Sequence, residues 1–107
     1  MKLLLDECVD ERLRLSFSEC ECETARFVGL AGLNNGRLLD AAEAAGFDVL
    51  ITVDQNIPSQ QNLRGRRLSP MILGGATNRV RGLRPLVPAA KVVLKTILPG
   101  TVIVIRP

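Results

Sequence analysis

Short runs of consecutive apolar residues, separated by longer amphipathic segments, are the sequence feature that most limits the fold of this chain. The first run, residues 3–5 (LLL), is followed by Asp6, and the clearest one, residues 48–53 (DVLITV), is followed by Asp54. Uninterrupted apolarity over so few residues is typical of parallel strands that are covered on both faces. Because such runs alternate with helical segments, the sequence predicts an α/β fold with helical crossovers.

Three amphipathic segments are predicted to be helices, over 9–17, from Asn34 or Asn35 to Ala45, and from Pro88 to Leu98. An asparagine accepts hydrogen bonds from the first free N–H groups of a helix, and a proline is tolerated in the first turn. Four residues are expected on the inner face of the second helix: Leu38, Leu39, Ala42 and Ala45.

Three further strands are predicted over 23–28, 68–73 and 101–105. Pro70 cannot donate a ladder hydrogen bond, so it favours an edge position or a bulge for the 68–73 strand. A chain of 107 residues with 47% hydrophobic content is long enough for one core. We therefore expect a single domain over 1–107, with a mainly parallel central sheet of about five strands.

The composition excludes several chemistries. The chain has no histidine, so a Ser/His/Asp triad, a His-ligated zinc and an imidazole general base are all ruled out. Any catalysis must use carboxylates, Lys, Arg or Cys. There is no Trp or Tyr and there are only three Phe, which argues against modules that stack single-stranded bases on aromatic rings.

Three cysteines, Cys8, Cys20 and Cys22, are present. The Cys20–Cys22 spacing is too tight for a typical structural zinc pair, and Cys8 leaves such a site one ligand short. The sequence opens with no signal peptide and contains no apolar stretch long enough for a membrane span. We therefore expect reduced thiols in a cytoplasmic protein with no membrane contact.

Charge is distributed unevenly along the chain. Residues 1–54 carry all eleven acidic residues and five of the fourteen basic ones, a net charge of −6. Residues 55–107 carry the other nine basic residues and no carboxylate side chain, a net charge of +9. Such asymmetry points to a charged partner.

Asp6 and Asp54 both follow predicted parallel strands, so both are expected at the carboxyl edge of the sheet, where open α/β sheets bind ligands. Two carboxylates about 4 Å apart would repel by about 4 kcal/mol at an effective dielectric constant near 20. A Mg²⁺ or Mn²⁺ ion would relieve that repulsion through oxygen ligands. The alternative is that such an acid only caps the next helix, as Asp6 could for the residues from Val9 onward.

The basic half offers candidate phosphate contacts, because guanidinium groups pair bidentately with phosphate oxygens. Arginines cluster at Arg64, Arg66 and Arg67 and again at Arg79, Arg81 and Arg84. The alternative is that they pair with the acidic half or solvate the surface. A segment rich in side-chain amides, residues 55–62, adds Gln61 and Asn62 as candidate contacts to bases or phosphates.

Three segments, LLLDE (3–7), GLNNGRLLDAAEAAG (32–46) and LITVDQNIPSQQNL (50–63), together with TNRVRGLRPLVPAA (77–90), resemble the PIN-like family, in particular its small bacterial members of uncharacterised function. The resemblance covers nearly the whole chain and implies a three-layer α/β/α PIN-like domain. It also implies Mg²⁺- or Mn²⁺-dependent RNA cleavage, often by the toxin of a toxin–antitoxin pair. Asp6 matches the first metal-binding aspartate, and Thr52-Val53-Asp54 matches the T-x-D motif that supplies another.

The chain departs from the family pattern at two places. Residues 35–37 read Asn-Gly-Arg where many relatives have an acid, and the nearest carboxylate is Asp40. Residues 54–56 read Asp-Gln-Asn where the motif often continues D-x-D. Glu7, Asp40 or Asn56 would then have to complete the metal shell around Asp6 and Asp54.

Three functions are left open by the sequence. The first is a metal-dependent ribonuclease with Asp6 and Asp54 at its centre. The second is a PIN-like module that binds RNA or a protein without cleavage. The third is a subunit whose basic face docks on an acidic antitoxin segment. A homodimer is among the oligomeric states that the sequence does not decide.

Overall fold

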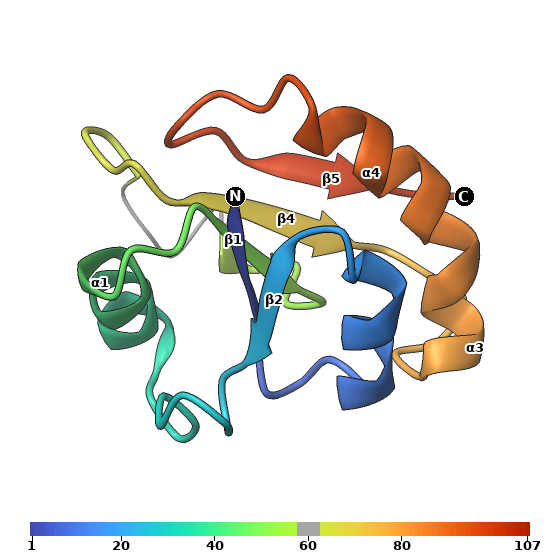
Figure 1. The fold of residues 1–107 in the computed structure, drawn as a ribbon, viewed down its shortest axis with the longest axis horizontal. Coiled ribbons are helices and arrows are strands. Elements are labelled where there is room, and N and C mark those ends of the chain that lie inside the picture. The colour runs from blue at the N-terminus through green and yellow to red at the C-terminus, as the bar shows by residue number, and fades with distance from the viewer. Residues whose placement is uncertain (58–62) are drawn as a thin grey trace.

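The computed structural model describes residues 1–57 and 63–107, and it shows an α/β fold built on one parallel sheet (Figure 1). Its five strands lie in the order β2-β1-β3-β4-β5, and every neighbouring pair is parallel. The strands are β1 (Lys2–Leu5), β2 (Glu21–Thr24), β3 (Val49–Thr52), β4 (Ser69–Leu73) and β5 (Ile103–Ile105). The predicted fold class is thereby confirmed.

Helical segments cover both faces of the sheet, which gives three layers (Figure 1). One face is covered by α1, and the other is covered by η1, α3, η2 and α4. Their bounds are η1 (Glu11–Phe17, a 3-10 helix), α1 (Asn35–Ala44), α3 (Val80–Leu83), η2 (Arg84–Leu86, also 3-10) and α4 (Val87–Leu94).

The core has two parts because side chains of a strand alternate between the faces of a sheet. Leu3 and Leu5 pack in the cluster on the side of η1 and α4, whereas Leu4 packs with α1. All three leucines are fully buried. The short LLL run is therefore apolar throughout because neither face of β1 meets water.

Helix boundaries agree in part with the sequence prediction. Asn34 caps α1, since its side chain accepts a hydrogen bond from the N–H of Arg37 at 3.3 Å. Ala45, predicted on the inner face of α1, is instead the exposed C-cap residue. The helix predicted to reach Leu98 ends at Leu94, and the backbone carbonyl of Leu98 accepts a 2.7 Å hydrogen bond from Ser69 Oγ of β4.

The 9–17 segment is a 3-10 helix that begins at Glu11, and it buries Leu13 and Phe17 as the four-residue spacing predicts. The second strand was misplaced, since β2 ends at Thr24 rather than running over 23–28. After Thr24 the chain turns, with the N–H of Val28 donating to the carbonyl of Thr24 at 3.2 Å.

Pro70 lies in β4, between β3 and β5, so the predicted edge position is wrong. The N–H of Ser69 points to the β3 side, where it donates to Asp48. Neighbouring residues of a strand point in opposite directions, so Pro70 lacks its N–H on the β5 side. The β5 strand pairs with β4 only from Met71 onward, and the missing donor therefore costs no ladder hydrogen bond.

No helix within residues 1–57 and 63–107 combines the length and apolarity that crossing a membrane requires.

Candidate functional site

The candidate site lies at the carboxyl edge of the sheet, between β1 and β3. The chain leaves β1 toward β2 on one side and places β3 on the other, so the strand order reverses at this point. The connecting segments also lie on opposite faces, η1 with one core cluster and α1 with the other. Ligands of open α/β sheets bind in the crevice at such a switch point.

The register of β1 and β3 brings the predicted aspartates to this edge. Leu5 pairs with Ile51, and the N–H of Asp6 continues the ladder by donating to the Ile51 carbonyl at 2.9 Å. Asp6 therefore lies opposite Thr52. Asp54 follows two residues later in a turn, where its Oδ1 accepts the N–H of Asn56 at 2.9 Å.

A threonine hydroxyl connects the two strand ends. Thr52 Oγ1 donates to Asp6 Oδ2 at 2.8 Å and accepts the N–H of Asp54 at 3.1 Å. The other Asp6 oxygen, Oδ1, accepts the N–H of Glu7 at 2.8 Å. Thr52 is fully buried and Asp6 is only 8% exposed, so the Asp6 carboxylate is fixed by two hydrogen bonds in a largely water-free position.

The structure shows that Asp6 is not the cap of the following helix. Asp10 has that role, because its Oδ1 accepts the N–H of Arg12 at 3.0 Å. Hydrogen bonds from the Arg12 guanidinium, the Arg12 N–H and the Val80 N–H hold the pKa of Asp10 well below its usual range. The alternative that Asp6 serves only as a helix cap is therefore wrong.

Cys8 lies beside this network, with its Sγ 3.6 Å from Thr52 Oγ1. Partial burial is the main cause that raises the pKa of the Cys8 thiol above its usual value. A thiol of raised pKa stays protonated near neutral pH, and it is then a poor nucleophile and a poor metal ligand. Cys8 therefore contributes a weak hydrogen bond to Thr52 rather than chemistry of its own.

The other predicted metal ligands are placed less favourably. Glu7 Oε1 accepts the N–H of Gly32 at 2.9 Å, and Asn56 is exposed in the turn after Asp54. Asp40, on α1, pairs with Arg66 instead, at 2.7 Å from Nη2. The Asp40 carboxylate is therefore engaged by a guanidinium group.

Among the described residues, no group of three or more His, Cys, Asp or Glu side chains is arranged to hold a metal ion. Mg²⁺, however, commonly binds proteins through only one or two carboxylates and keeps several waters. The carboxylate of Asp6, fixed at the strand end, has lone pairs beyond those used by its two donors. The described residues therefore fit at most a hard divalent ion that keeps most of its waters, and they do not fit an all-protein cage.

The predicted phosphate contacts do not lie at the edge of the sheet that carries Asp6. Arg66 and Arg67 precede β4, so they belong to the amino edge of the parallel sheet, opposite the edge that carries Asp6. The N–H of Arg67 donates to Glu43 Oε2 at 3.0 Å, near the end of α1. Arg64 is exposed in the same connection, while Gln61 and Asn62 lie outside the described residues.

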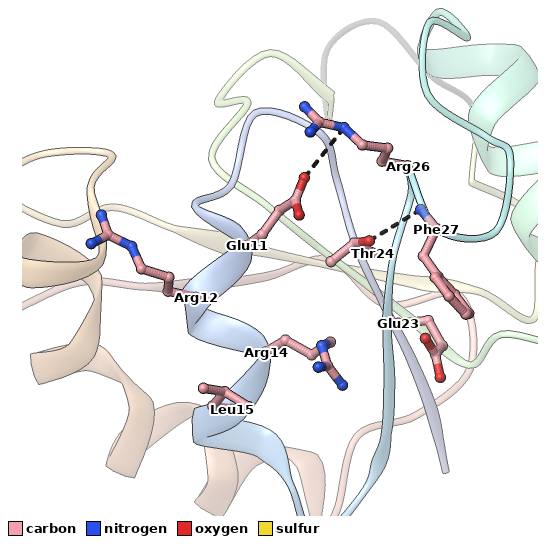
Figure 2. A pocket seen from close by; sticks show the side chains of 8 residues that line it. All are labelled: Glu11, Arg12, Arg14, Leu15, Glu23, Thr24, Arg26 and Phe27. Carbon is pink, nitrogen blue, oxygen red and sulfur yellow. Dashed lines mark hydrogen bonds and ion pairs between the residues drawn. The ribbon is translucent and has the colours of Figure 1, made fainter.

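A hollow of about 660 Å³ lies between η1 and β2 (Figure 2). Its positive charge comes from Arg12, Arg14 and Arg26. Glu11 and Glu23 balance part of this charge, and Arg26 pairs with Glu11 at 3.4 Å. Phe27 is 78% exposed at its border. Figure 2 shows Arg12 leaving η1 on the side turned away from Phe27 and Glu23. Mixed charge leaves this hollow without a clear ligand preference.

The sequence predicted that Asp6 and Asp54 lie at one edge of the sheet, but it did not predict that the Thr52 hydroxyl contacts both of them. It also showed Arg79 and Arg81 as a cluster without assigning them a place. Neither the β1–β3 register nor the contact between η1 and α3 can be derived from local sequence alone.

Comparisons with protein-family models, with curated proteins and with solved structures found no match to this chain.

Proposed function

We propose that this protein is a metal-dependent ribonuclease of PIN-like type, with Asp6 and Asp54 as ligands of a Mg²⁺ or Mn²⁺ ion. The observation that carries the proposal is the Thr52 hydroxyl, which ties Asp6 to the end of β3 at the switch point of the sheet. Burying a carboxylate charge without a cationic hydrogen-bond partner lowers stability, and a bound divalent ion would offset that desolvation cost.

The contribution of the protein's own residues would be to orient the metal ligands. Thr52 and the N–H of Glu7 hold the Asp6 carboxylate in one orientation, which pre-organises an oxygen ligand. A divalent ion bound there would lower the pKa of a water and stabilise the charge that develops on a phosphate during in-line attack. The absence of histidine agrees with this chemistry, since the water needs no imidazole base.

RNA is the proposed substrate, and a toxin with a protein antitoxin is the proposed biological setting. Both come from the family resemblance and from the basic second half of the chain.

A second candidate is a PIN-like module that binds RNA or a protein without cleaving it. One observation favours it: the described residues offer no third acidic ligand, and Asp40, the nearest candidate on α1, is paired with Arg66. A site with two carboxylates would bind metal more weakly than one with three or four.

A cleavage assay separates the two candidates. The purified full chain is incubated with a labelled single-stranded RNA and Mn²⁺ or Mg²⁺, and with EDTA as the metal-free control. The variants are Asp6→Asn and Asp54→Asn, which remove charge with little change of shape. Asp48→Asn is the matched control, because Asp48 accepts the N–H of Lys2 at the amino edge of the sheet.

Metal-dependent cleavage that is lost in Asp6→Asn and Asp54→Asn but kept in Asp48→Asn would support the proposal. Cleavage that persists in both site variants would exclude the assigned ligands. Binding of RNA without cleavage by the unmodified protein would favour the non-cleaving module.

A further inference from the structure

A second hollow, of about 400 Å³, opens between η1 and α3. Five residues line it: Arg12, Thr77, Arg79, Val80 and Arg81. Three of the five are arginines, from two segments that are far apart in sequence. The carboxylate in direct contact with this group is Asp10, so positive charge is in excess here.

Arg12 is held in place by Asp10. Its Nε lies 3.0 Å from Asp10 Oδ1 and its Nη2 lies 2.7 Å from Oδ2, a bidentate pair. A guanidinium has five N–H donors, so this pair leaves three for a ligand. The same Asp10 also accepts the N–H of Val80 at 3.2 Å, which joins η1 to α3. The Arg12 guanidinium is therefore oriented by Asp10, and the first N–H of α3 is already satisfied.

Arg79 and Arg81 are exposed and make no ion pair with any described residue. Their backbone is held by close packing. Thr77 Oγ1 accepts the N–H of Arg79 at 3.2 Å, and a Cβ on Gly82 would lie only 2.5 Å from the same oxygen. The loop after β4 therefore packs directly on α3, and it carries two exposed guanidinium groups without an ion-pair partner among the described residues.

This hollow belongs to the same edge of the sheet as the candidate metal site. The loop that carries Arg79 follows the carboxyl end of β4, and η1 follows the carboxyl end of β1. Asp6 and Asp10 are four residues apart, so their Cα atoms are separated by no more than about 14 Å. One RNA segment is long enough to reach both places.

We propose that the hollow formed by Arg12, Arg79 and Arg81 binds a backbone phosphate of single-stranded RNA and delivers the strand to Asp6 and Asp54. The identity of the ligand rests on the proposed function. Guanidinium groups suit this ligand because their N–H forks match phosphate oxygens, and the hollow has no aromatic ring on which a base could stack. Recognition is then of the backbone and not of base sequence.

RNA binding without cleavage tests this site. A fluorescein-labelled single-stranded RNA is titrated with the full chain in EDTA, and fluorescence anisotropy gives Kd at several salt concentrations. The test variant is Arg79→Gln/Arg81→Gln. The matched control is Lys91→Gln/Lys95→Gln, which removes two cations that lie with Met1 at the amino edge of the sheet. Labelled poly-glutamate is titrated in parallel as a non-nucleic polyanion.

We expect Kd for RNA to rise about tenfold or more in Arg79→Gln/Arg81→Gln. The slope of log Kd against log salt should fall by about 0.7, since the hollow is proposed to hold one phosphate and each phosphate contact on a single strand contributes about 0.7. The control should keep Kd within about twofold. Circular dichroism should show the same melting temperature for the test variant as for the unmodified protein, because both side chains are exposed.

Unchanged Kd and slope in Arg79→Gln/Arg81→Gln would overturn the proposal, and so would an equal loss in the control. Tighter binding of poly-glutamate than of RNA, lost in the same variant, would overturn it in favour of an acidic protein segment. Arginine-dependent RNA binding by a protein that does not cleave with Mn²⁺ would support this site while refuting the ribonuclease function.

Discussion

Thr52 Oγ1 donates a 2.8 Å hydrogen bond to Asp6 Oδ2, and this contact joins the ends of two neighbouring parallel strands. The same hydroxyl accepts the N–H of Asp54, so one buried oxygen contacts both candidate ligands. Orienting a carboxylate through a neutral hydroxyl keeps its negative charge available for a cation. A cationic partner would have neutralised it.

Replacing Thr52 with valine should test this relationship. Valine has nearly the same shape but no hydroxyl, so Asp6 Oδ2 loses its donor in a position that is 8% exposed. The free energy of unfolding should fall by about 1–3 kcal/mol, measured by urea denaturation. Thr96→Val, at an exposed position, is the control and should change stability by less than about 0.5 kcal/mol. Equal stabilities of Thr52→Val and the unmodified protein would show that the hydroxyl does not support Asp6.

Asp40→Asn should leave the proposed metal-dependent RNA cleavage intact, because the Asp40 carboxylate is engaged by the Arg66 guanidinium at 2.7 Å. The Asp40 side chain is 73% exposed, so losing the pair should cost less than about 1 kcal/mol of stability. Cleavage rate and urea denaturation are measured on the same preparation. A loss of cleavage at unchanged stability would contradict this placement and return Asp40 to the metal shell.

The fold could be predicted from the sequence because its signals are local. An apolar run such as residues 3–5 has one structural solution in a covered parallel sheet, and Asn34 caps α1 through its own neighbour Arg37. The positions of Asp6 and Asp54 followed from the same logic, since parallel strands end at one edge. Knowing that β1 and β3 are adjacent was not needed for that step.

The positions of the arginines could not be predicted, because they depend on contacts between segments that are distant in sequence. The arginines at 64, 66 and 67 were predicted to contact phosphates, but residues that precede a parallel strand lie at its amino edge, opposite the edge that carries Asp6. Their partners, such as Asp40 for Arg66, become visible only when α1 and β4 are placed together. In the same way, Arg12 and Arg79 are 67 positions apart and meet only because η1 packs beside α3.

Gly82→Ala should destabilise the loop that carries Arg79. A Cβ at position 82 would lie 2.7 Å from the backbone nitrogen of Thr77 and 2.8 Å from its carbonyl oxygen, distances at which the backbone must shift. Overpacking of this kind costs about 1–3 kcal/mol, and the melting temperature should fall accordingly. RNA affinity in EDTA should also fall, since the arginines lose their support. A variant that melts at the temperature of the unmodified protein would show that the loop can move aside without cost.

Stability should depend on pH through Asp10. Hydrogen bonds from the Arg12 guanidinium, and then from the N–H groups of Arg12 and Val80, hold the pKa of this carboxyl well below its ordinary value of 3.8. A carboxyl whose pKa is lower in the folded state stabilises the fold fully above its ordinary pKa and loses that contribution as pH falls toward the folded-state pKa. The stability difference between the unmodified protein and Asp10→Asn should therefore be constant above about pH 5 and shrink below about pH 4.

Urea denaturation at a series of pH values measures this difference. Arg12→Met removes the largest cause of the shift, so Asp10 in that background should titrate closer to its ordinary pKa and the pH-dependent part of the difference should become smaller. The Val80 N–H would still be satisfied by Asp10 in Arg12→Met, which separates the guanidinium contribution from the contact that joins η1 to α3. A difference that stays constant down to about pH 2 would mean that Asp10 gains nothing from its three donors in the folded protein.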